Sequence, residues 1–195
     1  MAVVFKQEFY DLHKLKKPNQ YIETGTYLGY WVLGVLGHYD KIHSIELSKK
    51  LYDYNVKQFS SEDTVIIHHG DSKVLLTSIL QTINEPALIF LDAHYSGGTT
   101  AYGEEEVPLL HELEILAKRK YDDIIVIDDC RLLGKKGKCG AKQSKVYPPM
   151  NYDWTTITIQ EIKNRMKKNY KLFDNMSKYY KGKIIDRYIL IPVKE

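Results

Sequence analysis

The stretch QYIETGTYLGYW, residues 20–31, decides the fold that this sequence predicts. A short apolar run ends in an acid, Glu23, and two glycines four positions apart, Gly25 and Gly29, precede an apolar segment with helical spacing. Glycine adopts backbone conformations that other residues avoid, so the pair predicts a tight turn. The stretch therefore predicts a strand, a glycine turn and a helix in direct succession, with a carboxylate at the turn.

The same alternation continues along the chain. Apolar runs of strand length are separated by segments long enough for a helix, which is typical of a parallel sheet covered by helices on both faces. We expect strands at 20–24, 41–47, 64–69, 87–92 and 123–128. We expect helices at 3–16, 29–38, 48–59, 71–82 and 104–119.

The C-terminal part departs from this alternation. A helix-like segment at 158–169 precedes two strand-like runs, YKLFDN at 170–175 and DRYILIPVK at 186–194. The region between them contains Lys181, Gly182 and Lys183 rather than a helix, so the two runs predict an antiparallel hairpin. The sequence predicts one α/β domain over residues 1–195, with a doubly wound, mostly parallel sheet that ends in this hairpin.

Composition and charge limit the classes of function. The chain is 44% hydrophobic and 27% charged, and its net charge of +3 is too small to predict a nucleic-acid binder. Basic clusters at 14–17, 135–145 and 163–168 form either a solvated surface or an attractive surface for an anionic ligand. Cys130 and Cys139 lack zinc-site spacing. Early charges and the lack of a long uncharged run predict a cytoplasmic protein without a membrane partner.

Two long polar loops follow the fourth and fifth expected strands. They are HYSGGTTAYG at 94–103 and GKKGKCGAKQSKVYPPMNYDW at 134–154. Ligands of open α/β sheets bind outside the carboxyl ends of the strands, so we expect these loops to border the site and to act as lids.

Every expected parallel strand ends in or beside a carboxylate. Because parallel strands end at one edge of the sheet, these acids should gather there. Helix capping explains Asp71 and could extend to Asp129, but it does not explain the whole set. A cofactor with ribose hydroxyls and a positive centre, or a divalent metal, would satisfy such a group. The acids are Glu23, Glu46, Asp71, Asp92, Asp128 and Asp129.

The glycine turn differs from that of a dinucleotide enzyme. Glu46 lies about twenty residues beyond it, as an acid that binds ribose hydroxyls should. However, only Gly25 and Gly29 match part of the G-x-G-x-x-G fingerprint, and Tyr27 stands where the second glycine would admit a pyrophosphate. Glu23 would also repel phosphate. The turn therefore favours a nucleoside cofactor without phosphate.

IETGTYLGY resembles the first motif of class I S-adenosylmethionine-dependent methyltransferases, and especially that of catechol O-methyltransferase and its relatives. The resemblance covers about residues 20–130 as an ordered series of motifs. It implies a seven-stranded Rossmann-like methyltransferase fold and S-adenosylmethionine, whose positive sulfonium suits an acidic site. It assigns the methionine pocket to Gly25, Tyr27 and Gly29, the cofactor amino group to Glu23, the ribose to Glu46 and the adenine to Asp71 and Ser72.

FLDAHY and IIVIDDC resemble motifs of metal-dependent O-methyltransferases, including sugar-modifying enzymes. The resemblance implies that Asp92, Asp128 and Asp129 hold Mg²⁺ or Mn²⁺, with Asp92 also beside the cofactor. The catechol enzyme has a lysine base where this chain has Tyr95, so His94 is the predicted catalytic base. A metal-adjacent or structural role is the alternative for His94.

The two loops also indicate the acceptor. Their aromatic residues could stack on a sugar or simply anchor the loops, and LDAHYSGGTTAYGEEE resembles sugar- and glycan-modifying methyltransferases. We expect transfer to a hydroxyl of a small-molecule or glycan acceptor. The alternatives are phenol or catechol methylation, nucleic-acid methylation, an NAD-dependent oxidoreductase and a non-catalytic nucleotide-binding module. Nucleic acid is disfavoured because strand four lacks the Asn/Asp-Pro-Pro-aromatic run of amino-methylating enzymes. The aromatic residues are Tyr95, Tyr102, Tyr147, Tyr152 and Trp154.

Overall fold

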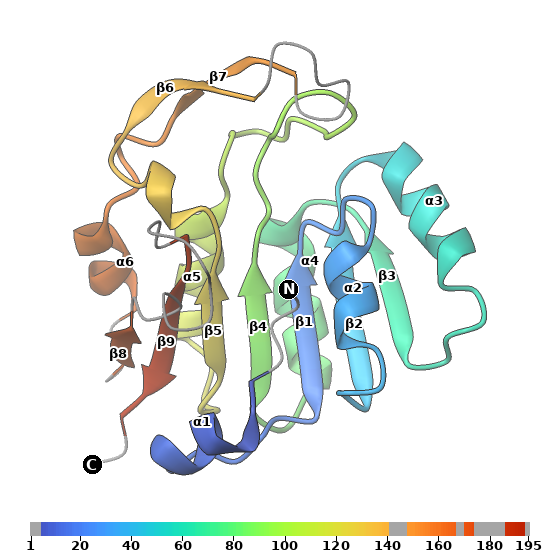
Figure 1. Cartoon of the computed structure of the whole chain (residues 1–195), viewed down its shortest axis with the longest axis vertical. Helices are drawn as coiled ribbons and strands as arrows, with labels where there is room; N and C mark the ends of the chain where they lie inside the picture. The colour runs from blue at the N-terminus through green and yellow to red at the C-terminus, as the bar shows by residue number, and fades with distance from the viewer. Residues whose placement is uncertain (1–4, 141–147, 167–169, 174–185, 194–195) are drawn as a thin grey trace.

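The computed structural model describes residues 5–140, 148–166, 170–173 and 186–193. Within them, seven strands form one sheet in the order β3-β2-β1-β4-β5-β9-β8 (Figure 1). The first five pair in parallel, and β9 is antiparallel to both β5 and β8. The strands are β1 (Gln20–Thr24), β2 (Lys41–Glu46), β3 (Val65–His69), β4 (Ala87–Leu91), β5 (Ile124–Ile127), β8 (Tyr170–Phe173) and β9 (Tyr188–Pro192).

Helices cover both faces of the sheet (Figure 1). One face packs against α1 and α2, with α3 beside β2 and β3, and the other face packs against α4, α5 and α6. The predicted doubly wound sheet is therefore confirmed. The helices are α1 (Gln7–Leu12), α2 (Tyr30–Val35), α3 (Lys49–Gln58), α4 (Ser72–Thr82), α5 (Leu109–Ala117) and α6 (Ile159–Arg165), with a 3₁₀ turn, η1, at Cys130–Leu132.

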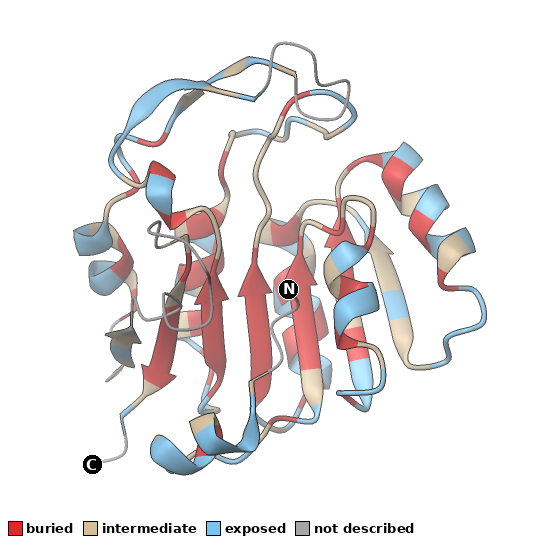
Figure 2. Cartoon of the chain, in the orientation of Figure 1, coloured by how far each residue is buried: buried red, intermediate tan, exposed pale blue. Residues whose placement is uncertain are grey.

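The apolar runs of β4 and β5 explain the two layers. Successive side chains of a strand point to opposite faces, so Leu88 and Phe90 join the core under α1 and α2. Ile89 and Leu91 join the core under α4 and α5. Both strands are buried along their whole length, as the red central strands of Figure 2 show. A continuous apolar run is what a strand covered on both faces requires.

The expected elements differ from the observed ones mainly at their ends. The five parallel strands lie where they were predicted, within one residue at either end, whereas the helices are shorter, and α1 covers Gln7–Leu12 of the predicted 3–16. The pairing of β8 with β9 confirms the predicted hairpin strands. The turn predicted at Lys181–Lys183 lies outside the described residues. No helix in the described part of the chain combines the length and the apolar character that crossing a membrane requires.

The segment 134–154 corrects one prediction. It was expected to be a loop, but it contains an antiparallel pair of strands, β6 (Lys136–Cys139) and β7 (Met150–Asp153). The residues of KGKC and MNYD have little intrinsic β propensity. The two strands form by pairing with each other, and the paired residues are more than ten positions apart in the sequence. The pair lies beyond the carboxyl edge of the main sheet (Figure 1).

Candidate functional site

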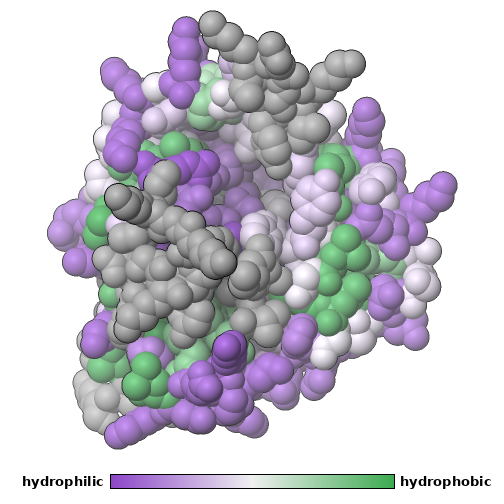
Figure 3. Space-filling view, in the orientation of Figure 1, coloured by the Kyte–Doolittle hydropathy of each residue, from purple (hydrophilic) through white to green (hydrophobic). Residues whose placement is uncertain are grey.

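A cavity of about 550 Å³ lies at the carboxyl edge of the parallel strands. The ends of β1, β2, β4 and β5, the loop 93–106 and the β6–β7 pair all contribute to its wall. In Figure 3 the surface is hollowed above the centre of the sheet, and hydrophilic side chains border the hollow. The predicted position of the site, outside the strand ends and under the two long loops, therefore agrees with the structure.

The two glycines of the first turn do different things. Gly25 lines the cavity with φ +86°, and a Cβ there would lie 2.5 Å from the backbone oxygen of Asp92, so glycine lets the ends of β1 and β4 approach. Gly29 has φ +75° and does not line the cavity. A Cβ at Gly29 would meet the side chains of Asn55 and Phe59 at 2.6 and 2.7 Å. One glycine shapes the cavity, and the other lets the turn pack on α3.

Tyr27 and Glu46 join the first two strands at the cavity. Tyr27 has φ +50°, a left-handed conformation that is unfavourable for a bulky residue. Its backbone N–H donates to Glu46 Oε2 at 2.8 Å, and its carbonyl accepts from Asn55 Nδ2 at 2.6 Å. Glu46 Oε1 accepts from the Ser48 N–H at 2.8 Å. Burial raises the pKa of Glu46, although these backbone hydrogen bonds act in the opposite direction.

Glu23 lies beneath the cavity rather than in its wall. Its side chain is fully buried and accepts hydrogen bonds from Tyr21 Oη and Ser44 Oγ, both at 3.2 Å. Burial raises the pKa of Glu23 to about 8. Glu23 was predicted to lie near the cofactor amino group. The structure places its carboxyl in hydrogen bonds with Tyr21 of β1 and Ser44 of β2, and Glu23 does not line the cavity.

Asp71 and Ser72 line the cavity at the beginning of α4. Asp71 Oδ1 accepts from the Lys73 N–H at 2.9 Å, so this acid caps the helix as predicted and also faces the cavity. Lys73 Nζ contacts carboxylate oxygens of Glu104 and Glu105 at 3.0 and 3.3 Å. These ion pairs hold the loop 93–106 close to the start of α4.

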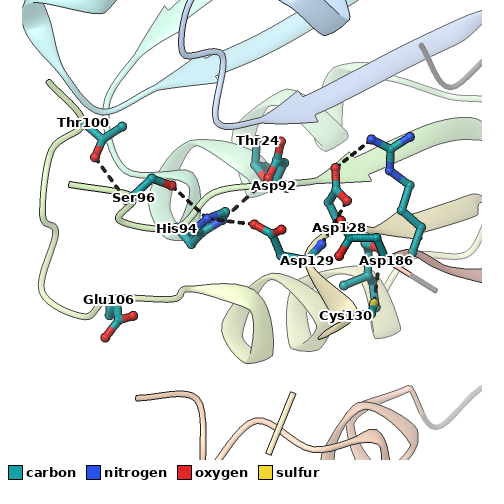
Figure 4. A network of polar contacts seen from close by, with 12 residues as sticks. Thr24, Asp92, His94, Ser96, Thr100, Glu106, Asp128, Asp129, Cys130 and Asp186 are labelled. Atoms are coloured by element: carbon teal, nitrogen blue, oxygen red, sulfur yellow. Dashed lines mark hydrogen bonds and ion pairs between the residues drawn. The ribbon is translucent and has the colours of Figure 1, made fainter. Parts of the chain in front are cut away.

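Asp92, His94 and Asp129 come together from the ends of β4 and β5. His94 Nε2 lies 2.9 Å from Asp129 Oδ2, and His94 Nδ1 lies 3.6 Å from Asp92 Oδ1 (Figure 4). One potential ligand atom from each residue lies within 4.8 Å of the other two. Ser96 Oγ contacts His94 Nε2 at 2.9 Å, and Trp154 packs edge-on at 5.4 Å between ring centres. The imidazole is therefore held between two carboxylates.

The pKa values of this group reflect burial and the mutual interaction of its charges. Burial raises the pKa of Asp92 well above its ordinary value, and the carboxylates of Asp128 and Asp129 add to the increase. Burial lowers the pKa of His94, but the hydrogen bond with Asp129 and the other carboxylates outweigh it, and the net change is upward. Burial would raise the pKa of Asp129, yet His94 and Arg131 lower it. Such perturbed groups in one cavity mark a candidate active site.

Asp128 belongs to a different arrangement. Its Oδ2 contacts Arg187 Nη2 at 2.9 Å, and burial raises the pKa of Asp128 more than this arginine lowers it. Within the described residues, Asp128 forms a second possible ligand group with Asp129 and Asp186. The three predicted metal ligands are thus divided between two groups that share Asp129.

Three residues at this edge were not identified from the sequence: Arg131, Asp186 and Arg187. All three line the cavity. Arg131 contacts Asp129 and Asp186, and Arg187 pairs with Asp128 across 59 positions of sequence. The one available signal was Asp186-Arg187 at the start of the last expected strand, which is antiparallel and so begins at the carboxyl edge.

The predicted acceptor aromatics are also divided. Tyr95, Tyr152 and Trp154 line the cavity, whereas Tyr102 does not and is exposed. Tyr147 lies outside the described residues. Trp154 is buried, and its Nε1 donates to Glu106 Oε1 at 3.2 Å, so this indole anchors the loop. Of the predicted acceptor aromatics, Tyr95 and Tyr152 therefore remain as side chains in the cavity wall that a ligand could reach.

Comparisons with known proteins agree on the fold. No family model and no curated protein matches the sequence. A structure of a S-adenosylmethionine-dependent methyltransferase from Clostridium acetobutylicum has a TM-score of 0.53 at 13% identity, over 96% of this chain and 89% of that one. The SAH-bound methyltransferase PaMTH1 from Podospora anserina has a TM-score of 0.55 at 16% identity, over 91% and 73%.

A third similar structure is the N-terminal domain of EvdMO1, solved in the presence of SAH and D-fucose. Its TM-score is 0.52 at 8% identity, over 95% of this chain and 78% of that domain. These identities are too low to carry an activity from one protein to another, but the shared architecture is clear. The chain has the Rossmann-like fold of the S-adenosylmethionine-dependent methyltransferases.

Proposed function

We propose that this protein transfers the methyl group of S-adenosylmethionine to a hydroxyl of a small acceptor, a sugar or a glycan, at a divalent metal site. One observation carries the proposal. A single cavity holds Glu46 and Asp71 on one side and the Asp92–His94–Asp129 group on the other. A nucleoside with a positive centre suits the first side, and a divalent cation with a hydroxyl suits the second.

The cofactor side is built for a ligand without phosphate. Gly25 and Tyr27 line the cavity, and Glu46 is fixed by two backbone N–H groups, so that its remaining lone pairs can accept from ribose hydroxyls. Asp71 and Ser72 form the wall beside the adenine position. Bound S-adenosylmethionine supplies a methyl group on a positively charged sulfur, which an acidic wall attracts where it would repel a pyrophosphate.

The donor set beside β4 and β5 fits a hard divalent cation. Asp92 and Asp129 offer carboxylate oxygens, which Mg²⁺ and Mn²⁺ prefer, and one ligand atom of each lies within 4.8 Å of the other. When bound, the cation supplies a Lewis acid that makes an acceptor hydroxyl more acidic. Asp92 and Asp129 would hold it.

His94 is the proposed proton acceptor. It lies between the two carboxylates, and Ser96, Trp154 and Asp129 fix its ring orientation. Histidine is the side chain whose ordinary pKa lies nearest neutrality, so it can take a proton from the acceptor hydroxyl as the oxygen attacks. Glu46 and Asp71 line the same cavity as His94, so a bound cofactor and acceptor would be held close together, which would favour transfer by proximity.

The charges of the cavity favour an uncharged acceptor. The lysine and arginine residues among its described lining each contact carboxylates: Lys73 contacts Glu104 and Glu105, Arg131 contacts Asp129 and Asp186, and Arg187 contacts Asp128. Lys136 and Lys138 do not line the cavity and are exposed on β6. An acceptor phosphate would therefore enter an acidic environment. Hydroxyls beside Asp129 and a sugar face on Tyr152 fit it better.

The experiment is a screen of free sugars, glycosides and phenols with methyl-labelled S-adenosylmethionine. We expect label in sugar hydroxyls, loss of transfer in excess chelator and recovery with Mg²⁺ or Mn²⁺. Label in phenols alone would replace the acceptor assignment. Full transfer in excess chelator would refute the metal site.

A variant separates the two roles considered for His94. His94→Ala should lower turnover while leaving the affinities for S-adenosylhomocysteine and Mn²⁺ largely unchanged. Loss of Mn²⁺ binding would make His94 a metal ligand. Unchanged turnover would remove it from the mechanism.

A further inference from the structure

Two arginines sit among four aspartates at the acidic edge. Asp92 follows β4, Asp128 and Asp129 follow β5, and Asp186 precedes β9. Arg131 lies in η1, directly after the Asp pair, and Arg187 directly follows Asp186. Each arginine contacts a different part of this group, and the difference bears on how many cations it can hold.

Arg187 is a buried, fixed partner. Its side chain is 6% exposed, and Nη2 lies 2.9 Å from Asp128 Oδ2. The guanidinium also lies over Trp31, 4.2 Å from the ring centre, and within 5.2 Å of Phe90. Stacking on two aromatic rings keeps this charge beside Asp128 at a low cost in mobility.

Arg131 is placed differently, on the open rim. Its side chain is 41% exposed, and a single nitrogen, Nη1, contacts Asp129 Oδ1 and both carboxylate oxygens of Asp186, the farther of them at 2.6 Å. Lys135 Nζ donates to the Arg131 carbonyl at 2.8 Å and so ties down the turn. Nη1 therefore occupies the position that a cation would take between Asp129 and Asp186.

Asp129 is shared between the two sides. Its Oδ1 contacts Arg131, and its Oδ2 contacts His94 Nε2 at 2.9 Å. The left-handed backbone of Asp129, with φ +55°, places the carboxylate between these partners. Arg131 thus turns one oxygen of Asp129 away from the Asp92–His94 side and leaves the other facing it.

The arginine contacts then limit the number of cations. Arg131 contacts one oxygen of Asp129 and both oxygens of Asp186, and Arg187 contacts one oxygen of Asp128. Within the described residues, the Asp129 oxygen on the side of Asp92 and His94 has no arginine contact, and this side is left for one divalent cation. A second divalent ion would lie across the same Asp129 carboxylate, beside Arg131, where repulsion between like charges opposes it.

We propose that Arg131 is a resident counter-ion and a positioning residue, which occupies the space between Asp129 and Asp186 and limits the site to a single divalent cation held by Asp92 and Asp129. This inference rests on the metal site of the proposed function. It assigns to Arg131 a role in the number of bound ions, not in the transfer itself.

The test measures Mn²⁺ stoichiometry by calorimetry, with electron paramagnetic resonance of free Mn²⁺ as a check. The wild-type protein and Arg131→Lys, which keeps the charge, should bind one ion. Arg131→Gln should bind two, with the second ion lost again in the double variant Arg131→Gln/Asp186→Asn. Arg165→Gln is the matched control, because Arg165 pairs with Glu114 and Glu161 on the surface and does not line the cavity.

The outcomes are distinct. Binding of two Mn²⁺ ions by the wild-type protein would overturn the inference. Binding of one ion by Arg131→Gln with unchanged affinity, or weaker Mn²⁺ binding by this variant, would also overturn it. If Arg131→Gln folds poorly, a larger Mn²⁺-dependent rise in its Tm than in Arg131→Lys would still support it, and an equal rise would overturn it. Absence of Mn²⁺ binding in all variants would remove both this inference and the metal site. S-Adenosylhomocysteine binding in the same samples tests the cofactor side of the proposed function separately.

Discussion

Strand β5 has the same dipeptide at both ends, Asp122-Asp123 before it and Asp128-Asp129 after it, and the two ends behave differently. At the amino end, Asp123 is 1% exposed and pairs with Arg119 Nε at 2.8 Å. The other Arg119 nitrogens donate to three backbone carbonyls, and Asp123 accepts the Ala87 N–H at 2.9 Å. At the carboxyl end, four aspartates face two arginines.

The difference separates a structural ion pair from a ligand site. Asp123 and Arg119 carry opposite charges that cancel, and their hydrogen bonds are satisfied. This buried pair therefore needs no further ion or ligand. The carboxyl edge keeps surplus negative charge in a cavity, which costs stability unless a cation or a positively charged ligand binds. Excess charge, rather than the presence of acids, marks the site.

The largest expected effect comes from removing the arginine of the charge-balanced pair at the amino end of β5. Arg119→Gln leaves the Asp123 carboxylate buried without its cation, and we expect the free energy of unfolding to fall by about 3 to 5 kcal/mol. Arg165→Gln, which removes a partly exposed surface pair, should cost less than about 1 kcal/mol. Urea unfolding of both variants checks this. Equal stability of the two would show that the Arg119–Asp123 pair is not structural.

The next largest effect concerns the acidic carboxyl end of β5. Asp129→Asn removes a proposed ligand, and we expect turnover to fall by roughly a hundredfold or more. The free energy of unfolding should fall by less than in Arg119→Gln, because Asp129 loses its contacts with His94 and Arg131 but one negative charge is removed from a group of four aspartates. Asp122→Asn, at an exposed position before β5, is the matched control and should change neither quantity. A marked loss of stability in Asp129→Asn would place this carboxylate with the structural pair instead.

The third prediction divides the carboxyl edge into its two sides. Glu46→Gln removes the charge proposed to hold the ribose, and we expect S-adenosylhomocysteine affinity to fall by about 10- to 100-fold with Mn²⁺ affinity unchanged. Glu85→Gln, whose carboxylate contacts Asn19 and Gln20 at the amino edge, is the control. Calorimetry measures both ligands. Loss of Mn²⁺ binding in Glu46→Gln would mean that the two sides are one site.

The smallest effect concerns Glu23, whose buried carboxyl lies below the cavity. Its pKa is 4.5 when unfolded and about 8 when folded, because burial disfavours the carboxylate, and Glu46 adds to this. The folded state therefore holds a proton that the unfolded state has lost, and stability falls as the pH rises from about 4.5 to about 8. The slope should reach at most about 1.4 kcal/mol per pH unit. Glu23→Gln should flatten it in denaturant titrations, and an unchanged slope would contradict the assignment.

The sequence was sufficient to predict the features that follow from strand direction, namely the parallel strands and the acids at their carboxyl ends. Apolar runs of five or six residues located β1 to β5, and parallel strands must bring their following residues to one edge, so Glu46, Asp71, Asp92 and Asp129 were placed together correctly. Asp122-Asp123 precedes β5 and so lies at the opposite edge of the sheet from Asp128-Asp129. Strand direction therefore separates two identical dipeptides.

Other features depended on contacts that one sequence does not reveal. Glu23 lies within β1, on the face that carries Tyr21, so the period-two alternation of a strand directs it into the layer under the cavity. The pairing of Arg187 with Asp128, and of Arg131 with Asp186, joins segments more than 50 residues apart. The β6–β7 pair has lysines and a glycine where strands usually have β-branched residues.

The central proposal is that the acidic edge binds the nucleoside shared by S-adenosylmethionine and S-adenosylhomocysteine and does not bind a dinucleotide. Calorimetric titration of the wild-type protein with S-adenosylhomocysteine and with NAD tests it most directly. We predict that one S-adenosylhomocysteine binds per chain and that NAD does not bind. Binding of NAD without binding of S-adenosylhomocysteine would contradict the claim.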